Sequence, residues 1–331
     1  MKRRLQSDFR SAINLSMIDA WTRVPGGPQE PDFVASLVLH GTPLIHNAIV
    51  ANAGGLYNSV NTVGVFCHQS PMVTYADGGV NRTCELGDVL WCHFHTDQAG
   101  YVFRNALLFQ SKISRAANPH IPYNDTQLKL YREWPQFSYT RAGTLNGQIR
   151  NYLPKQPHDG AQYMIIDGRR INLGSGRLDP LFFRPNPMRT STVTPLIYAD
   201  TSLQAELVRF LFWGSGKPFG GWNEGGPNDV WTKVVWDLLR NGMQRAFNRR
   251  RAGFNNEPRI TINSSDMDGM VAFKGATYEF KADFEDSFYD EFEKLFANSD
   301  GGKNNVENNE LINKDDGAPS IVIIRTNEKK G

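Results

Sequence analysis

The feature of this sequence that most limits its fold is a long stretch without charge. No Asp, Glu, Lys or Arg occurs from Phe33 to Ala76. Such a stretch has to be buried, either in a protein core or in a bilayer. Gly41, Pro43, Asn47 and Gly54 interrupt it, so it holds no run of about 20 apolar residues that would span a bilayer. The stretch therefore predicts a buried core and no membrane.

The length and the composition predict a globular protein. The chain has 331 residues, of which 40% are hydrophobic and 21% charged, and this length favours about two domains. Three cysteines are too few for a disulfide framework and favour a reducing, cytoplasmic compartment. Residues 1–19 lack the continuous apolar block of a signal peptide. We expect an N-terminal nuclease-sized core at residues 1–142 and a C-terminal elaboration at residues 143–331.

Apolar spacing and capping residues predict the order of the helices and strands. Helices are expected from Ser7 to Pro25, from Pro31 to Gly41, from Asn124 or Asp125 to Tyr131, from Ser202 to Gly214, from Asn228 to Phe247, and along the stripe Phe284 to Phe296. Strands are expected at residues 63–68, 88–95, 101–113, 137–139 and 321–324, with a hairpin loop at residues 96–100. This order predicts an α/β protein whose mixed central sheet is flanked by helices.

The charges are distributed unevenly along the chain. The whole chain carries a net charge of +2, but the segment Asp283 to Asp316 has eleven acids and three bases, so the rest of the chain carries +10. A basic body fits a polyanion partner such as nucleic acid, although an ordinary solvated surface has similar charges. Arg249, Arg250 and Arg251 close the long helix after Asn228. Both phosphate contacts and the helix dipole explain cations at this position.

The expected hairpin brings three polar groups together. If His95 lies opposite Tyr101, residue 88 faces residue 108 and is diagonal to residue 110, and a shift of two residues places it opposite residue 110. In either register Asp88, Gln110 and Lys112 lie on one face of the sheet, because strand side chains alternate. Opposite and diagonal neighbours are roughly 5 to 8 Å apart. The three groups can therefore meet at one ion and one water.

A carboxylate, an amide and an ammonium group in one place suit metal-dependent hydrolysis. Mg²⁺ prefers hard oxygen ligands, and the Asp88 carboxylate, the Gln110 side-chain oxygen and the Ser111 backbone carbonyl would supply them. The metal and Lys112 would together lower the pKa of an attacking water and offset charge that builds on phosphorus. An ordinary ion pair between Lys112 and Asp88 at the end of a sheet is the alternative.

The motifs around this hairpin resemble those of the PD-(D/E)xK restriction-endonuclease-like superfamily. The segment Cys84 to Leu90 contains Asp88, and Gln110-Ser111-Lys112 is similar to the QxK variant of Mrr-type restriction enzymes. On the following helix, Gln127-Leu128-Lys129-Leu130-Tyr131 is similar to the QxxxY element of the RecB-like nucleases. The resemblance covers roughly residues 30 to 140, and the motifs occur in the order of the superfamily.

The resemblance implies a restriction-endonuclease-like core and a nuclease that depends on Mg²⁺ or Mn²⁺. DNA would be the substrate, and prokaryotic defence or restriction would be the role. By the same resemblance Asp88 is the metal carboxylate, Gln110 a metal ligand and Lys112 the catalytic lysine. Gln127 and Tyr131 would face the metal or the phosphodiester.

The superfamily pattern is incomplete at two positions. Gln110 stands where an acid is commoner, which removes a negative charge and weakens the expected metal affinity. A second acid would come from Glu85 or from Glu30 on the early helix. Strand alternation places Glu85 on the opposite face unless Gly87 forms a bulge.

Two other classes of function stay open. The first is a binding module, in which Gln110 marks a decayed site on a nuclease fold that holds nucleic acid or a protein partner. The second is a subunit, or a homo-oligomer, that stays inactive until a partner docks on the stripe Phe284 to Phe296.

Three further motifs favour ordinary structure. Cysteine and histidine gather at Cys67, His68, Cys84, Cys92, His93 and His95, but without a Cys-x-x-Cys pair, so buried thiols and edge histidines explain them better than zinc. Gly214-Ser215-Gly216-Lys217 follows a helix and is expected to end it rather than to bind phosphate. Asp266-Met267-Asp268-Gly269 lacks the closing Glu of a calcium loop and predicts a turn.

Overall fold

The computed structural model describes residues 1–24, 27–67, 71–115, 125–153, 155, 157–169, 186–193, 201–221, 229–243, 270–275 and 318–329. The helices are α1 (Lys2–Arg23), α2 (Glu30–Ser36), α3 (Thr42–Ala53), α4 (Thr126–Glu133), α5 (Leu203–Leu211) and α6 (Val230–Met243), with a π-helical segment η1 (Leu37–Gly41) and a 3-10 turn η2 (Gly143–Leu145). The expectations for Arg249, Arg250 and Arg251, for Asp266 to Gly269 and for Asp283 to Asp316 lie outside the described residues.

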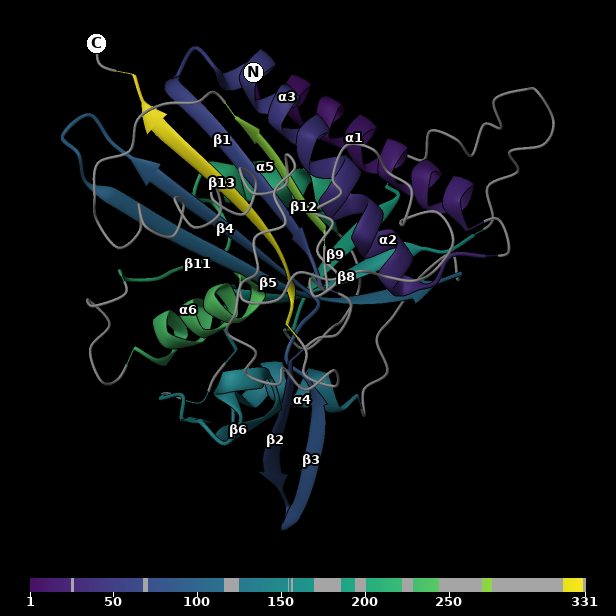
Figure 1. Ribbon diagram of the computed structural model, residues 1–331, viewed down its shortest axis with the longest axis vertical. Coiled ribbons are helices and arrows are strands. Elements are labelled where there is room, and N and C mark those ends of the chain that lie inside the picture. Colours follow the sequence, from purple (N-terminus) through teal and green to yellow (C-terminus); the bar gives the residue numbers. More distant parts are fainter. Residues whose placement is uncertain are drawn as a thin grey trace, which may run out of the picture.

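The strands form two sheets (Figure 1). The large sheet has the order β10-β9-β8-β5-β4-β13-β1-β12, with β11 paired to β5, and the small sheet has the order β3-β2-β6-β7. Their bounds are β1 (Tyr57–Phe66), β2 (Met72–Asp77), β3 (Val80–Glu85), β4 (Val89–Thr96), β5 (Val102–Ser114), β6 (Phe137–Arg141), β7 (Ile149–Arg150), β8 (Ala161–Asp167), β9 (Met188–Thr192), β10 (Thr201–Ser202), β11 (Lys217–Pro218), β12 (Met270–Gly275) and β13 (Ser320–Glu328).

The large sheet is mixed and has helices on both faces, which confirms the predicted α/β class. Strands β4 and β13 run parallel, as do β5 and β8, and the other described pairs of this sheet are antiparallel. Alternate residues of β4 point to opposite faces: Trp91 packs with α1, α3 and α5, and Cys92 packs with α4 and α6. Strands from residues 1–142 and from residues 143–331 share this sheet, and the domain boundary between them stays a prediction.

The hairpin of β4 and β5 takes the second of the two expected registers. Val89 lies opposite Phe109 and His95 opposite Phe103, so position 88 falls opposite position 110. The loop closes where the Asp97 amide donates to the Tyr101 carbonyl. Gly100 adopts a φ of +90°, a conformation that glycine tolerates at no steric cost. The observed register puts Asp88 beside Gln110.

Two helix boundaries differ from the sequence prediction. Helix α1 begins at Lys2 rather than near Ser7, because Leu5 is fully buried and packing extends the helix. Gly41 does not end the second helix, since α2 continues through η1 and α3 to Ala53. A Cβ at Gly41 would lie 2.8 Å from the Ser16 Oγ. Gly41 therefore permits close packing against α1 instead of stopping the helix.

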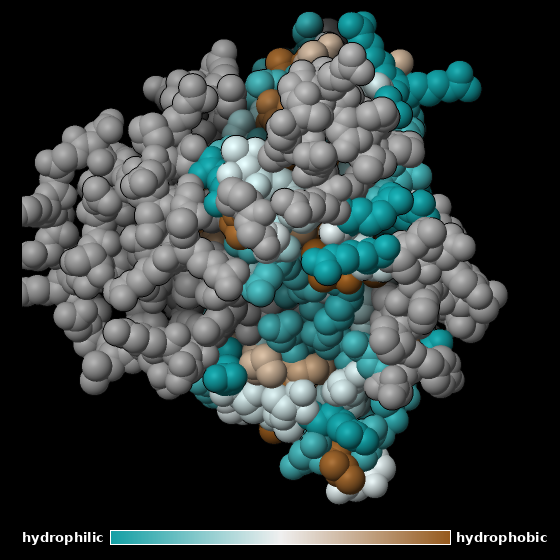
Figure 2. All heavy atoms as spheres, turned by 90° about the vertical axis from the view of Figure 1, so that its right-hand side faces the viewer, coloured by the Kyte–Doolittle hydropathy of each residue, from teal (hydrophilic) through white to brown (hydrophobic). Residues whose placement is uncertain are grey.

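The continuous helical stretch Glu30–Ala53 has the length and hydropathy of a membrane span. This differs from the sequence expectation, in which the interruptions excluded such a span. In the structure 72% of its most apolar window is buried inside the fold. A buried core helix has the same properties, so this feature is weak evidence for a membrane. On the face drawn in Figure 2, the coloured residues are mostly hydrophilic, and apolar residues form small separate groups.

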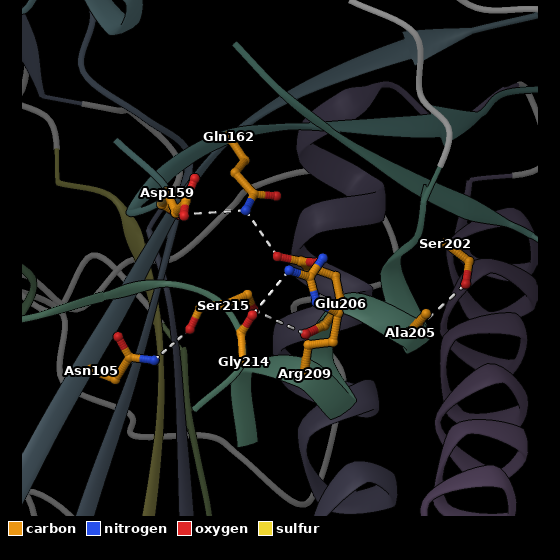
Figure 3. A network of polar contacts seen from close by, with 9 residues as sticks. All are labelled: Asn105, Asp159, Gln162, Ser202, Ala205, Glu206, Arg209, Gly214 and Ser215. Carbon is orange, nitrogen blue, oxygen red and sulfur yellow. Dashed lines mark hydrogen bonds and ion pairs between the residues drawn. The ribbon is translucent and has the colours of Figure 1, made fainter. Parts of the chain in front are cut away.

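A polar network fastens α5 to the sheet (Figure 3). The buried Glu206 on α5 accepts a hydrogen bond of 2.8 Å from Gln162 on β8 and pairs with Arg209 at 3.1 Å. Past the helix, Ser215 offers its carbonyl to Asn105 on β5 at 2.6 Å, and Gly216 has a φ of +82°. Helix α5 ends at Leu211, three residues before Gly214, and Trp213 takes the left-handed conformation (φ +63°) that turns the chain. The segment Gly214 to Lys217 follows this helix end, and the Gly214 amide donates to the Arg209 carbonyl of the last turn.

Candidate functional site

The candidate site lies where β4 begins. Asp88 stands immediately before β4, and its backbone is bonded on both sides: its amide donates to the Phe109 carbonyl of β5, and its carbonyl accepts from the Ser320 amide of β13, each at 2.8 Å. Because β13 and β5 flank β4 in the sheet, this residue is held by two strands. Its carboxylate is positioned by the backbone rather than by a flexible loop.

The Asp88 carboxylate contacts β5 directly. Its Oδ2 accepts a hydrogen bond of 2.5 Å from the Gln110 Nε2 and one of 2.6 Å from the Ser111 backbone amide. Gln110 and Ser111 are fully buried. The expected meeting of Asp88 with the Gln110 side chain on one face of the sheet is therefore present. Strand alternation places Lys112 on the same face as Gln110.

Helix α4 completes a chain of hydrogen bonds. Its N-cap is Asp125, whose side chain accepts from the Leu128 amide, so the first turn of the helix presents Gln127 to the sheet. The Gln127 Nε2 donates to the Gln110 Oε1 at 2.7 Å. The chain of donors thus runs from Gln127 through Gln110 to Asp88. The spacing of the motif signalled Gln127, but the sequence carried no signal for this direction of donation.

Tyr131 has a structural role in this arrangement. Its side chain is fully buried, and its hydroxyl donates to the Leu86 carbonyl at 2.7 Å. The expectation that Tyr131 faces a metal or a phosphodiester stays a prediction, and in the structure the hydroxyl is bonded to the backbone two residues before Asp88. At Gly87 a Cβ would lie 2.7 Å from Leu108 and 3.0 Å from the Tyr131 hydroxyl. Tyr131 and Gly87 thus shape the loop that leads into Asp88.

Glu30, at the start of α2, lies within electrostatic reach of Asp88. Burial, together with the nearby charges of Asp88 and Glu85, raises its pKa to about 8, although Lys112 and a hydrogen bond from the Ile113 backbone act to lower it. These four groups therefore lie within electrostatic reach of the Glu30 carboxyl. The suggested second acid, Glu30, is therefore close enough to Asp88 for the two charges to interact.

Glu85 lies nearby but not on the strand that the sequence suggested. It is the last residue of β3 in the small sheet, opposite Met72 of β2. The chain leaves strand geometry between Glu85 and Val89. The alternation argument that placed Glu85 behind Asp88 is therefore wrong, because the two residues belong to different strands. Its backbone carbonyl also accepts a hydrogen bond of 3.5 Å from the Gln127 Nε2.

Two of the three oxygen atoms that the sequence suggested as metal ligands, from Asp88 and Ser111, lie around the Gln110 amide nitrogen. The Gln110 Nε2 lies 2.5 Å from the Asp88 Oδ2 and 3.3 Å from the Ser111 carbonyl oxygen, so an electropositive group already sits between two of the three expected ligands. The third, Gln110 Oε1, faces Gln127 instead. A rotation of the Gln110 amide by half a turn would aim Oε1 at the same place. The described residues contain no group of three or more His, Cys, Asp or Glu that would hold a metal.

The other chemical groupings in the described residues have ordinary explanations. The cysteines Cys67, Cys84 and Cys92 are buried and free, and burial raises the pKa of the Cys84 thiol to about 12. His93 and His95 both contact the Thr326 hydroxyl at 2.9 Å. Burial lowers the pKa of His93 to about 3. The thiols are buried, as expected from the sequence, but His93 and His95 lie on the central strand β4 rather than at an edge of the sheet. His93 is fully buried and His95 partly buried, and His68 lies outside the described residues.

We compared the chain with known protein families, with curated proteins and with solved structures, and none of the three comparisons found a match.

Proposed function

We propose that this protein is a metal-dependent nuclease that hydrolyses phosphodiester bonds in DNA. One observation supports this most strongly: Asp88, Gln110 and Ser111 make direct contact at the start of β4, and Gln127 joins them from the next helix. The quoted motifs also lie on the elements that the resemblance implies, since Asp88 precedes β4, Gln110 to Lys112 lie on β5 and Gln127 lies on α4. We therefore propose a restriction-endonuclease-like core and a role in prokaryotic defence.

In this proposal each side chain has a definite task. Asp88, the Ser111 carbonyl and Gln110, after rotation of its amide, would hold Mg²⁺ or Mn²⁺. When bound, this ion would lower the pKa of a water molecule and offset charge on the phosphate. Lys112 carries a positive charge on the same face of β5 and stabilises the additional negative charge of the transition state. Glu30 would add a carboxyl from α2. Gln127 holds the Gln110 amide in its observed orientation, so the Gln127 amide would have to turn together with that of Gln110 and accept from it.

A binding module that does not cut nucleic acid is the second candidate. The amide at position 110 supplies no negative charge, and its oxygen faces Gln127 rather than Asp88. These two observations favour a fold that has kept the shape of a nuclease site without its activity. The basic character of the chain outside residues 283–316 suits this function equally well.

Nicking of a supercoiled plasmid separates the two candidates. We expect the parent to nick the plasmid in Mg²⁺ and not in EDTA, and we expect Asp88→Ala and Lys112→Ala to lose at least a hundredfold in rate. Lys129→Ala is the matched control, because Lys129 on α4 pairs with Asp77 of β2 outside the site. If parent and variants bind DNA equally and none nicks it, the nuclease proposal is refuted and the binding module remains.

A further inference from the structure

A cavity lies between α6 and the segment that contains η2 and β7, apart from the candidate site at Asp88. Its volume is about 500 Å³, within the range of pockets that hold small ligands. Its lining includes Arg150 from β7, and Lys233, Asp237 and Arg240 from α6. Three positive charges and one negative charge therefore border one concave space, and the proposed nuclease chemistry uses none of them.

The floor of the cavity is held by an ion pair. The Arg150 Nε donates to the Asp237 Oδ2 at 2.7 Å, and the Tyr139 hydroxyl donates to the same oxygen at 3.3 Å. The Arg150 Nη2 also donates to the Gln148 side-chain oxygen at 2.7 Å. Arg150 and Asp237 are only 14% and 10% exposed at their side chains. The guanidinium group is therefore fixed, and Asp237, the one acid among the described lining residues, is paired with it.

The rim of the cavity carries an excess of positive charge. Lys233 and Arg240 are exposed on α6 and lie seven residues apart, which is about two helical turns. Both side chains are long enough to bend toward a ligand between them. Thr144 and Asn241 also line the cavity. Among the described residues that line it, the four charged side chains sum to a net charge of +2.

We propose that this cavity binds a small phosphate ester of about nucleotide size. Guanidinium and ammonium groups with hydroxyl and amide donors are the groups that recognise phosphate in proteins. A concave space of about 500 Å³ matches a ligand of nucleotide size, and an extended nucleic-acid strand is the alternative that the titration has to exclude. The proposal does not rest on the nuclease function, because its residues and its cavity are separate from Asp88, Gln110 and Lys112.

Calorimetric titration with AMP tests the proposal. The titration is done in EDTA at low ionic strength, so that no metal and no cleavage are involved. We expect AMP to bind, adenosine to fail to bind, and the double variant Lys233→Ala, Arg240→Ala to weaken AMP binding at least tenfold. The double variant Arg4→Ala, Arg10→Ala removes the same charge from exposed positions of α1 and should leave AMP binding unchanged.

Three results would overturn the proposal. The first is equal affinity for AMP and adenosine, because a phosphate site must discriminate between them. The second is an equal loss of affinity in both double variants, which would show general charge attraction. The third is binding of a ten-nucleotide DNA strand, but not of AMP, that depends on Lys233 and Arg240, since these residues would then contact a nucleic-acid backbone. Unchanged melting temperatures of both double variants would show that every titration is done on folded protein.

Discussion

At the residue scale, Gln110 is the residue that joins Asp88 to Gln127 in the candidate site. Its amide donates to Asp88 and accepts from Gln127, so the three side chains are a single hydrogen-bonded unit. An acid at this position would repel Asp88 in the free protein and attract a cation. If the site binds a metal as we propose, the amide at position 110 lowers its affinity for the metal and stabilises the site without metal.

The variant Gln110→Glu tests this role of the amide. Two carboxylates in contact at a buried place repel each other, so we expect a lower melting temperature than the parent in EDTA. Mg²⁺ between the two acids should restore much of the loss, so the rise in melting temperature on adding Mg²⁺ should be larger in the variant than in the parent. Melting curves with and without 10 mM Mg²⁺, roughly saturating for such sites, measure both effects.

Gln162→Glu is the matched control for this experiment. Gln162 is also buried and donates to a carboxylate, that of Glu206, at 2.8 Å, but it lies in the α5 network of Figure 3. This variant should lose stability in EDTA and regain nothing with Mg²⁺. Equal rescue of both variants would mean that Mg²⁺ acts on the protein in general, and the special role of Gln110 would then be wrong.

Gln127 should matter for stability as well as for the site. In Gln127→Leu the buried Gln110 Oε1 loses its donor, and we expect the free energy of unfolding to fall by about 1–3 kcal/mol. Urea denaturation followed by circular dichroism measures the change. Gln98→Leu alters an exposed loop residue and should change the stability little. A Gln127→Leu protein as stable as the parent would contradict the hydrogen-bonded unit.

At the scale of elements, the contact between β1 and η1 depends on one glycine. A Cβ at Gly64 would lie 2.4 Å from the Val38 backbone carbonyl, and backbone cannot move aside as a side chain can. We expect Gly64→Ala to destabilise the protein by about 1–3 kcal/mol. Gly55→Ala is the control, because a methyl group added there would have no atom within 4 Å. Similar melting temperatures for both variants would show that β1 and η1 are packed less closely.

The local elements are largely predictable from the sequence, and their long-range pairing is not. The apolar spacing of α1, the Asp125 cap of α4 and the Ser202 cap of α5 are local signals, and the structure confirms them. The hairpin of β2 and β3 is absent from the sequence prediction, although Asp77-Gly78 is a turn signal. The position of β13 between β1 and β4 depends on contacts between distant parts of the chain, which periodicity cannot reveal.

In the candidate site, too, the local contacts were predictable from the sequence and the contacts between distant elements were not. The neighbourhood of Asp88 and Gln110 followed from the two-residue period of strands. The orientation of the Gln110 amide did not, because it depends on Gln127 from another element. Glu30 reached the site through the packing of α2, and Glu85 moved to a separate strand because the chain leaves strand geometry before Asp88.

At the scale of the whole molecule, the fully buried His93 and the partly buried His158 should make stability depend on pH. Burial lowers the pKa of His93 and of His158 to about 3, whereas an unfolded histidine has a pKa near ~6.5. The unfolded chain binds more protons between these values, so this stability is complete above ~6.5 and is lost as the pH falls toward 3. From pH 7.5 to pH 5 each histidine should cost about 2 kcal/mol.

Denaturation of the parent and of His158→Gln at these two pH values measures the effect. Glu30 acts in the opposite direction, because its raised pKa makes stability fall as the pH rises from 4.5 toward 8. The comparison of the two proteins removes this contribution, since both contain Glu30. We expect the variant to lose about 2 kcal/mol less than the parent on acidification. Equal losses would contradict a partly buried, neutral His158.

The most direct test of the central claim is a crystal structure grown with Mn²⁺. The claim is that Asp88, Gln110 and Lys112 on one face of the sheet serve a common cation. It predicts an anomalous peak in contact with the Asp88 carboxylate, with the Gln110 amide turned so that its oxygen faces the peak. A structure in which Mn²⁺ binds elsewhere, and Gln110 still donates to Asp88, would contradict the claim.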